Sequence, residues 1–488
     1  MNLAKKVAYN TIVQIIGKFA SSLLGLLAIS LMARYLGLNG FGEYTTIITF
    51  LSFFAVLIDF GLTLVTTQMI NQAGREDDEA WTNKILSNLM AFRLITAVFF
   101  LGLAPLTVMF FPYSAGVKMG IAVASFSFLF IALNQVLIGL FQKKLRMDKS
   151  IISEVASRII LLFGVYLAIK INSGLTGILI VSVISSAGNF LLNYLFAAKY
   201  AILRLRFDWP VWLELVKKSW PLALTIFFNL IYLRADTLIL SLFKPPSEVG
   251  LYGAAYKVVD VLITLPFMFA GIILPIITRL YNESNLAKFK DILQKSADFM
   301  IILAIPLAVG AQFVAKDIMI IVAGPDFSES GSALRILILA SGIIFAGCLF
   351  SHAIIAFDRQ KKIIKAYIFT AVTSLIGYLI FIPLYSYYGA AWVTIYSELS
   401  IAATSYLLVK RTIHFSFNLK ILFKSLTASA VMAVFLFGSS KFAVLNSIGG
   451  FWRLIFNLLV SAMVYLTVLY LIKGLKKEEI INLLKKNE

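Results

Sequence analysis

Residues 175–197 read LTGILIVSVISSAGNFLLNYLFA, an apolar run without one charged side chain. As a helix, such a run is long enough to cross the roughly 30 Å hydrocarbon core of a bilayer. Similar runs follow one another along the 488 residues, of which 60% are hydrophobic and 14% charged, with a mean hydropathy of +0.91. We therefore predict fourteen membrane spans, at residues 9–35, 44–70, 85–111, 118–141, 150–171, 175–197, 219–243, 250–277, 298–322, 332–357, 363–385, 389–409, 421–442 and 452–472.

The predicted spans are helices rather than strands. Their apolar runs are continuous instead of alternating, and a backbone in lipid must satisfy its hydrogen bonds within a helix or a closed barrel. The sequence therefore predicts an all-α integral membrane protein.

The basic residues indicate how the spans are oriented. Of the 43 Lys and Arg, only Lys118, Lys170, Lys244 and Lys441 lie in the loops opposite the segment that carries the N-terminus. An excess of Lys and Arg in short loops marks the cytoplasmic side of a membrane protein, so we predict that both termini are cytoplasmic. The net charge of +19 is then a topology signal and an attraction to anionic lipid headgroups, and we expect no nucleic-acid partner.

Short matches between the two halves of the chain indicate an internal repeat. They recur in the same order: GEY at 42–44 with GLY at 250–252, FQKK at 141–144 with FDRQKK at 357–362, and Gly174 with Gly389. A repeat of six spans keeps its orientation, so we predict two six-helix bundles related about the membrane normal, with a central cavity and an added C-terminal helix pair.

This organisation predicts four parts of the chain. Between the two bundles, residues 199–218 alternate apolar with charged residues, which is typical of a helix in the headgroup region. The parts are a first bundle at 1–198, a cytoplasmic interfacial linker at 199–218, a second bundle at 219–412, and helices 13 and 14 with a cytoplasmic tail at 413–488.

Charged residues inside the spans are costly in lipid and therefore need a role. Cations are suited to binding an anionic substrate, and acids are suited to coupling transport to protons or other cations. The substrate-binding candidates are Arg234, Arg158, Lys257, Arg93 and Lys18, and the ion-coupling candidates are Asp59, Asp236, Asp260 and Glu398.

Spacing leaves two interpretations open for several of these residues. Glu154 with Arg158 (i,i+4), and Lys257 with Asp260 (i,i+3), form either neutralised local pairs or part of a cavity lining. Arg234 and Asp236 do not face each other on a helix. The guanidinium of Arg234, near the middle of its span, contacts either a substrate diphosphate or an acid on another helix.

Two further candidates depend on the position of the residue in its span. Asp59 has no basic neighbour within one turn, so it is either a proton or cation site or pairs with a cation from the first or third span. Arg93 and Lys18 are close enough to the inner ends of their spans to snorkel to the cytoplasmic interface.

Several segments carry a resemblance to a known family: ARYLGLNGFGEY at 33–44, LIDFGL at 57–62, VGLYGAAYKVVD at 249–260 and AGPDFSES at 323–330. With them, the chain resembles the polysaccharide transporter family, the O-antigen and exopolysaccharide flippases of the multidrug/oligosaccharidyl-lipid/polysaccharide superfamily. The resemblance implies a flippase of the inner cell membrane that moves a polyprenyl-diphosphate-linked oligosaccharide to the outer leaflet by alternating access. The implied partners are that lipid, membrane lipids, a polysaccharide polymerase and a chain-length regulator.

Other functions were weighed against this interpretation. A lipid II flippase or a cation-coupled multidrug antiporter shares the expected fold, although the antiporters usually have twelve spans. The sequence contains no P-loop, HExxH or GxSxG motif and no cluster of Cys and His, so we expect neither an enzyme nor a cofactor. The two histidines, His352 and His414, are too few for a metal site, and Cys348, the single cysteine, has no partner for a disulfide within the chain.

Overall fold

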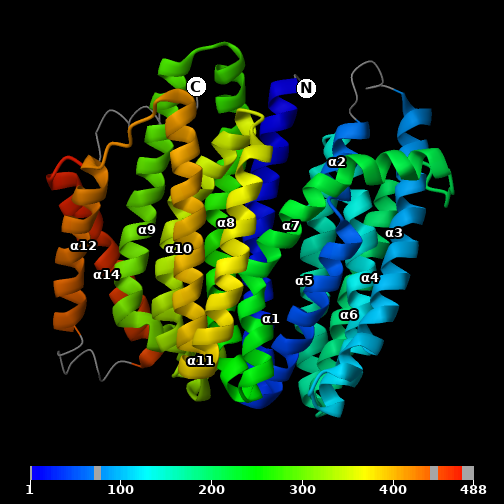
Figure 1. The fold of residues 1–488 in the computed structure, drawn as a ribbon. Coiled ribbons are helices and arrows are strands. Elements are labelled where there is room, and N and C mark those ends of the chain that lie inside the picture. Colours follow the sequence, from blue (N-terminus) through cyan, green and yellow to red (C-terminus); the bar gives the residue numbers. More distant parts are fainter. Residues whose placement is uncertain (1–2, 71–77, 440–448, 475–488) are drawn as a thin grey trace. The chain divides into compact units, whose positions relative to one another are not determined.

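The computed structural model describes residues 3–70, 78–439 and 449–474, and in these ranges every regular element is a helix (Figure 1). Two are short 3-10 segments, η1 (Val108–Phe110) and η2 (Pro325–Phe327). The α-helices are α1 (Leu3–Asp59), α2 (Leu62–Ile70), α3 (Glu79–Thr107), α4 (Ala115–Lys143), α5 (Met147–Lys170), α6 (Gly174–Ala197), α7 (Trp209–Phe243), α8 (Pro246–Asn282), α9 (Leu286–Ala323), α10 (Ser330–Ala356), α11 (Gln360–Ile413), α12 (Lys420–Ser439) and α14 (Gly450–Leu471). The all-α prediction is confirmed.

Twelve helices of the described chain are long and apolar enough to cross a membrane. Two of them, with 47 and 54 residues, would be roughly 70–80 Å long if straight, more than twice the hydrocarbon thickness. Each contains one non-helical residue, Gly37 (φ 63°) in α1 and Ser386 (φ 53°) in α11. Figure 1 shows α1 running away from the N-terminus and turning back. The total of fourteen spans and the internal repeat remain predictions.

The chain divides into two compact units, residues 1–253 and 254–488. The first unit has one core of buried Leu, Ile and Val from α2, α3 and α4, and another where α1 packs on α3, η1 and α4. The second unit has a core built on α8 to α11, and a smaller one where α9 meets α12 and α14. The four-part division predicted from the sequence stays a prediction.

Two motifs that carried the family resemblance meet inside the first unit. A Cβ atom added to Gly42 would overlap the carbonyl oxygen of Pro246, and one added to Gly250 would lie 2.3 Å from that of Leu38. Glycine is therefore required at both positions, because the backbones of α1 and α8 touch there. The two glycines that were matched as part of a sequence repeat therefore lie at a contact between α1 and α8.

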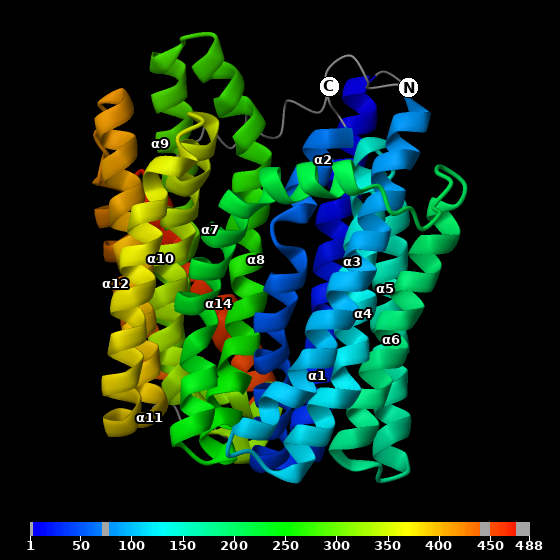
Figure 2. The same cartoon turned by 45° about the vertical axis from the view of Figure 1, so that its right-hand side comes forward.

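Two predicted segments differ from the observed helices. The predicted span 44–70 is broken between α1 and α2 at Phe60 (φ 45°) and Gly61 (φ 73°). The interfacial helix predicted at 199–218 begins only at Trp209 and continues into α7, whereas residues 201–208 are not helical. Figures 1 and 2 show that α7 changes direction after its first turns, which lie across α2 and α3. The end of the span predicted at 421–442 and the tail from residue 475 lie outside the described residues.

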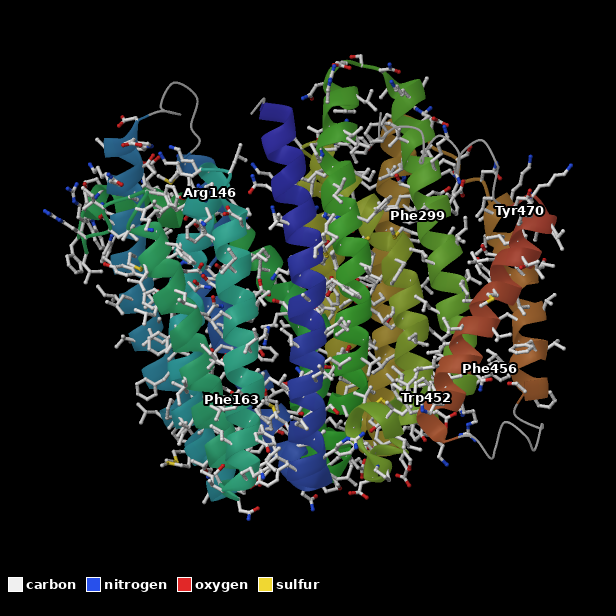
Figure 3. All side chains as sticks on the ribbon, turned by 180° about the vertical axis from the view of Figure 1, so that it is seen from behind. Arg146, Phe163, Phe299, Trp452, Phe456 and Tyr470 are labelled. Carbon is white, nitrogen blue, oxygen red and sulfur yellow. The ribbon has the colours of Figure 1, made fainter. Side chains whose placement is uncertain are left out.

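The outward faces of the helices are apolar, as lipid contact requires. Figure 3 shows Phe163 on α5 and Trp452 and Phe456 on α14 at such faces, where they are 61%, 65% and 41% exposed. Large exposed apolar side chains on this scale are incompatible with a water-facing surface. The chain is a multi-pass membrane protein.

Candidate functional site

An ion pair lies at the break between α1 and α2. Asp59, the last residue of α1, accepts from Arg93 Nη2 of α3 at 2.6 Å. The same nitrogen donates to Thr63 Oγ1 at 2.7 Å, and Nη1 donates to the Ala132 carbonyl of α4 at 2.9 Å. The guanidinium thus ties together the two sides of the break and two further helices.

This arrangement shows a partner for Asp59, whose role in ion coupling stays a prediction, and corrects the prediction for Arg93. Asp59 pairs with a cation from the third predicted span, which was one of its two interpretations. Arg93 does not snorkel to the interface, because its side chain is only 1% exposed. The bend at Phe60 and Gly61 directs the Asp59 carboxylate towards α3, and sequence spacing within one helix gives no signal for such a pair.

A second charged group lies where α1 runs beside α5. Lys18 Nζ donates to both carboxylate oxygens of Glu154 at 2.8 Å. One turn after Glu154 on α5, the Arg158 guanidinium faces Gly25 of α1, where an added Cβ would be 3.8 Å from Arg158 Cζ. Glu154 therefore pairs across helices with Lys18, and the predicted local pair of Glu154 with Arg158 does not form.

Arg158 is left as a cation without a counter-charge. In the described part of the chain its side chain makes no hydrogen bond or ion pair, and its buried Nε is without a partner. The side chain is half-buried, and Tyr44 of α1 lies within range of its charge. A half-buried guanidinium with unused donors, in a unit of apolar helices, is suited to binding an anion that enters from outside the protein.

Asp236 occupies a fully buried position on α7. Its carboxylate accepts from the Tyr252 hydroxyl at 2.7 Å and from the backbone N–H and hydroxyl of Thr237. Tyr252 belongs to the GLYG segment, so this bond fixes the start of α8 against α7. Arg234 on the same helix is half-buried, and both residues have further interactions within the chain.

The remaining candidates lie in the second unit. Lys257 Nζ and Asp260 Oδ2 of α8 are 4.0 Å apart, with side chains 23% and 27% exposed. Glu398 of α11 is only 8% exposed, and its Oε1 has no hydrogen-bond partner among the described residues. Elsewhere in the second unit hydroxyl groups pair with one another, as in Ser351–Ser405 at 3.2 Å and Thr370–Ser400 at 2.9 Å.

The histidine and cysteine of α10 have packing contacts. His352 Nδ1 lies 2.7 Å from the Cys348 carbonyl, and Cys348 is buried. Within the described residues, no group of three or more His, Cys, Asp or Glu is placed to hold a metal ion.

Comparison with known families identifies the group to which this arrangement belongs. The model of the family described as "polysaccharide biosynthesis protein" matches residues 7–281, which is more than half of the chain. The chain belongs to this family. The matched region contains every candidate residue described above in the first unit, together with Lys257 and Asp260.

Two curated relatives come from Haloferax volcanii. The probable flippase AglR is 30% identical over 169 residues, which are 34% of this chain and 35% of that protein. The probable low-salt glycan biosynthesis flippase Agl15 is 23% identical over 257 residues, 52% of this chain and 53% of that protein. The chain therefore matches about a third to a half of the length of these relatives.

Solved structures show the same fold. The lipid II flippase MurJ, in an inward closed conformation, has a TM-score of 0.75 at 20% identity, covering 94% of this chain and 98% of that one. An inward-facing MATE family multidrug resistance transporter of the MOP superfamily has a TM-score of 0.69 at 13% identity, covering 83% and 98%. At these identities the likeness shows the fold alone.

Proposed function

We propose that this protein is a flippase that moves a polyprenyl-diphosphate-linked oligosaccharide, an O-antigen or exopolysaccharide repeat unit, from the cytoplasmic to the outer leaflet of the inner cell membrane. The proposal depends on membership of a polysaccharide biosynthesis family, together with the similarity of this chain to two curated proteins that are described as probable flippases. The helical membrane fold supports it, because a transporter needs spans rather than a catalytic domain. In this proposal both termini are cytoplasmic, and a polymerase and a chain-length regulator use the product.

The chemistry of the substrate explains the need for an unpaired cation. A diphosphate carries about two negative charges and loses hydration when it enters apolar surroundings, which is costly unless charged donors replace the water. Each charge-assisted hydrogen bond returns about 1.5–3 kcal/mol. Arg158 has donors to offer because no residue of the described chain occupies them. Arg234, the first candidate from the sequence, now ranks after Arg158 because it has further interactions within the chain. Lys257 and Lys18 are also candidates, and Arg93 is paired with Asp59.

Deleting the gene tests this function directly. We expect the lipid-linked oligosaccharide to accumulate in the cytoplasmic leaflet and the surface polymer to disappear, with both restored by the wild-type gene. Accumulation of peptidoglycan precursor would instead support a lipid II flippase, and drug sensitivity with normal polymer would support a multidrug antiporter. Either result contradicts the proposal.

Within this function we propose Glu398 as the ion-coupling residue. A buried carboxylate with an unbonded oxygen is costly in apolar surroundings, so binding of a proton or a metal cation there would stabilise the second unit. The carboxylates of Asp59 and Asp236 already accept hydrogen bonds from other side chains, and Asp260 is more exposed.

We expect Glu398→Gln to abolish the stimulation of transport by a proton or sodium gradient in proteoliposomes. The amide keeps the size of the side chain but cannot gain or lose a charge. Glu329→Gln, at an exposed acid just before α10, is the matched control and should respond to the gradient like the wild type. A Glu398→Gln protein that still responds would exclude Glu398 from coupling.

A further inference from the structure

The chain between α6 and α7 is held in an extended path along α3, and we name residues 201–208 the strap. Figure 2 shows this trace leaving α6 and reaching the first turns of α7. Its backbone N–H groups are bound by α3 side chains: Ile202 N to Asn83 Oδ1 at 3.2 Å, Arg204 N to Ser87 Oγ at 3.2 Å, and Asp208 N to Asn88 Oδ1 at 2.8 Å.

The α3 residues that contact the strap form two neighbouring rows on one side of that helix, since Asn83 lies four residues before Ser87 and Lys84 lies four residues before Asn88. Lys84 on the same face pairs with the Asp208 carboxylate at 2.8 Å. Ala201 is buried and Leu203 packs on the first unit's core. Three backbone N–H groups of the strap and its single acid are therefore bound by α3.

The opposite face of the strap carries side chains that the protein leaves uncovered. Leu205 and Phe207 are 51% and 66% exposed, and Trp209, the first residue of α7, is 70% exposed. Arg204 and Arg206, which alternate with Leu205 and Phe207 along the chain, are exposed, and within the described residues neither side chain has a hydrogen bond or an ion pair. Cationic and apolar side chains thus alternate along the strap, which follows the end of α6 and is held by α3.

We propose that the strap is a binding site for anionic phospholipid headgroups. Guanidinium groups bind phosphate oxygens with paired, charge-assisted hydrogen bonds, and exposed Leu, Phe and Trp insert at the boundary between headgroups and acyl chains. The strap directly follows a membrane-spanning helix, which places it at the level of the headgroups. Holding the backbone fixed also lowers the conformational entropy lost when the lipid binds.

The lipid preference of the strap can be measured on the full chain in proteoliposomes. A fluorophore is attached at Ile202→Cys, a 64% exposed position, in a Cys348→Ala background, since Cys348 is the single cysteine. Brominated phosphatidylglycerol and brominated phosphatidylcholine then quench the probe, and their ratio gives a relative binding constant. We expect a preference for phosphatidylglycerol that weakens as the salt concentration rises.

The double variant Arg204→Gln with Arg206→Gln should lose this preference. Each arginine should account for about a fivefold change in the relative binding constant, since a basic residue near an anionic surface contributes about 1 kcal/mol. Lys361→Gln with Lys362→Gln removes the same charge from exposed positions on α11, and should leave the preference unchanged. Phe207→Ser should lower quenching by both lipids, because it weakens insertion without changing the charge.

Equal quenching by the two lipids in the wild type would overturn the proposal, as would a preference retained by the double arginine variant. A probe that neither lipid quenches, but that added cell proteins shield from iodide, would assign the strap to a protein partner instead. The proposal does not depend on the transported substrate, so it can fail while the flippase function holds.

Discussion

Arg93→Met is expected to lower the unfolding temperature more than any other single substitution considered for this protein. It leaves the Asp59 carboxylate without its cation and removes the bonds to Thr63 and to the Ala132 carbonyl. Removing one partner of a buried ion pair typically costs about 3–5 kcal/mol. The substitution also removes the bonds that hold α1 and α2 together at the break at Phe60 and Gly61, so we expect reduced transport together with reduced stability.

Thermal unfolding of the purified protein in detergent measures this effect. Lys18→Met is the matched control, because it breaks the Lys18–Glu154 pair, in which the lysine is 47% exposed and the expected loss is about 0–1 kcal/mol. Adding Asp59→Asn to Arg93→Met removes the unpaired charge, so the double variant should lose less than the sum of the two single losses. If Arg93→Met unfolded at the same temperature as Lys18→Met, the ion pair would not stabilise the break.

Arg158→Ala is expected to show the opposite combination, normal stability with little transport. The side chain makes no hydrogen bond or ion pair within the described residues, so its removal should change the stability by less than about 0.5 kcal/mol. If its guanidinium binds the substrate diphosphate, losing charge-assisted bonds of about 1.5–3 kcal/mol should slow transport roughly 10- to 150-fold. Arg158→Lys keeps the charge but not the paired donors, so it should keep part of the activity.

Surface polymer in the deletion strain, complemented at equal protein level, reports the transport of these variants. Arg335→Ala, at an exposed arginine of α10, is the control and should restore the polymer fully. Full complementation by Arg158→Ala would remove Arg158 from the substrate path. A fall in its unfolding temperature comparable with that of Arg93→Met would show that its role is structural.

The sequence by itself determined the class of protein and the positions of most helices. Long uncharged runs such as residues 175–197 must be helical in lipid, because no other open structure satisfies the backbone there. The sequence also identified the charged residues that need a role, because a charged residue within a long apolar run is easily recognised. Glycines in the FGEY and GLYG segments stood out as a repeated pattern, but the pattern did not reveal that their backbones touch.

Only the tertiary structure decided which charges are committed and which are available. Partners in one helix can be read from spacing, but Asp59–Arg93 and Lys18–Glu154 join different helices, and helix packing brings them together. The same packing left Arg158 and Glu398 with unbonded atoms, and it made residues 201–208 of the predicted interfacial helix an extended strap, whereas the helix begins at Trp209. Such outcomes depend on how whole helices pack and on small backbone changes, such as the positive φ at Phe60 and Gly61, which spacing along the sequence does not encode.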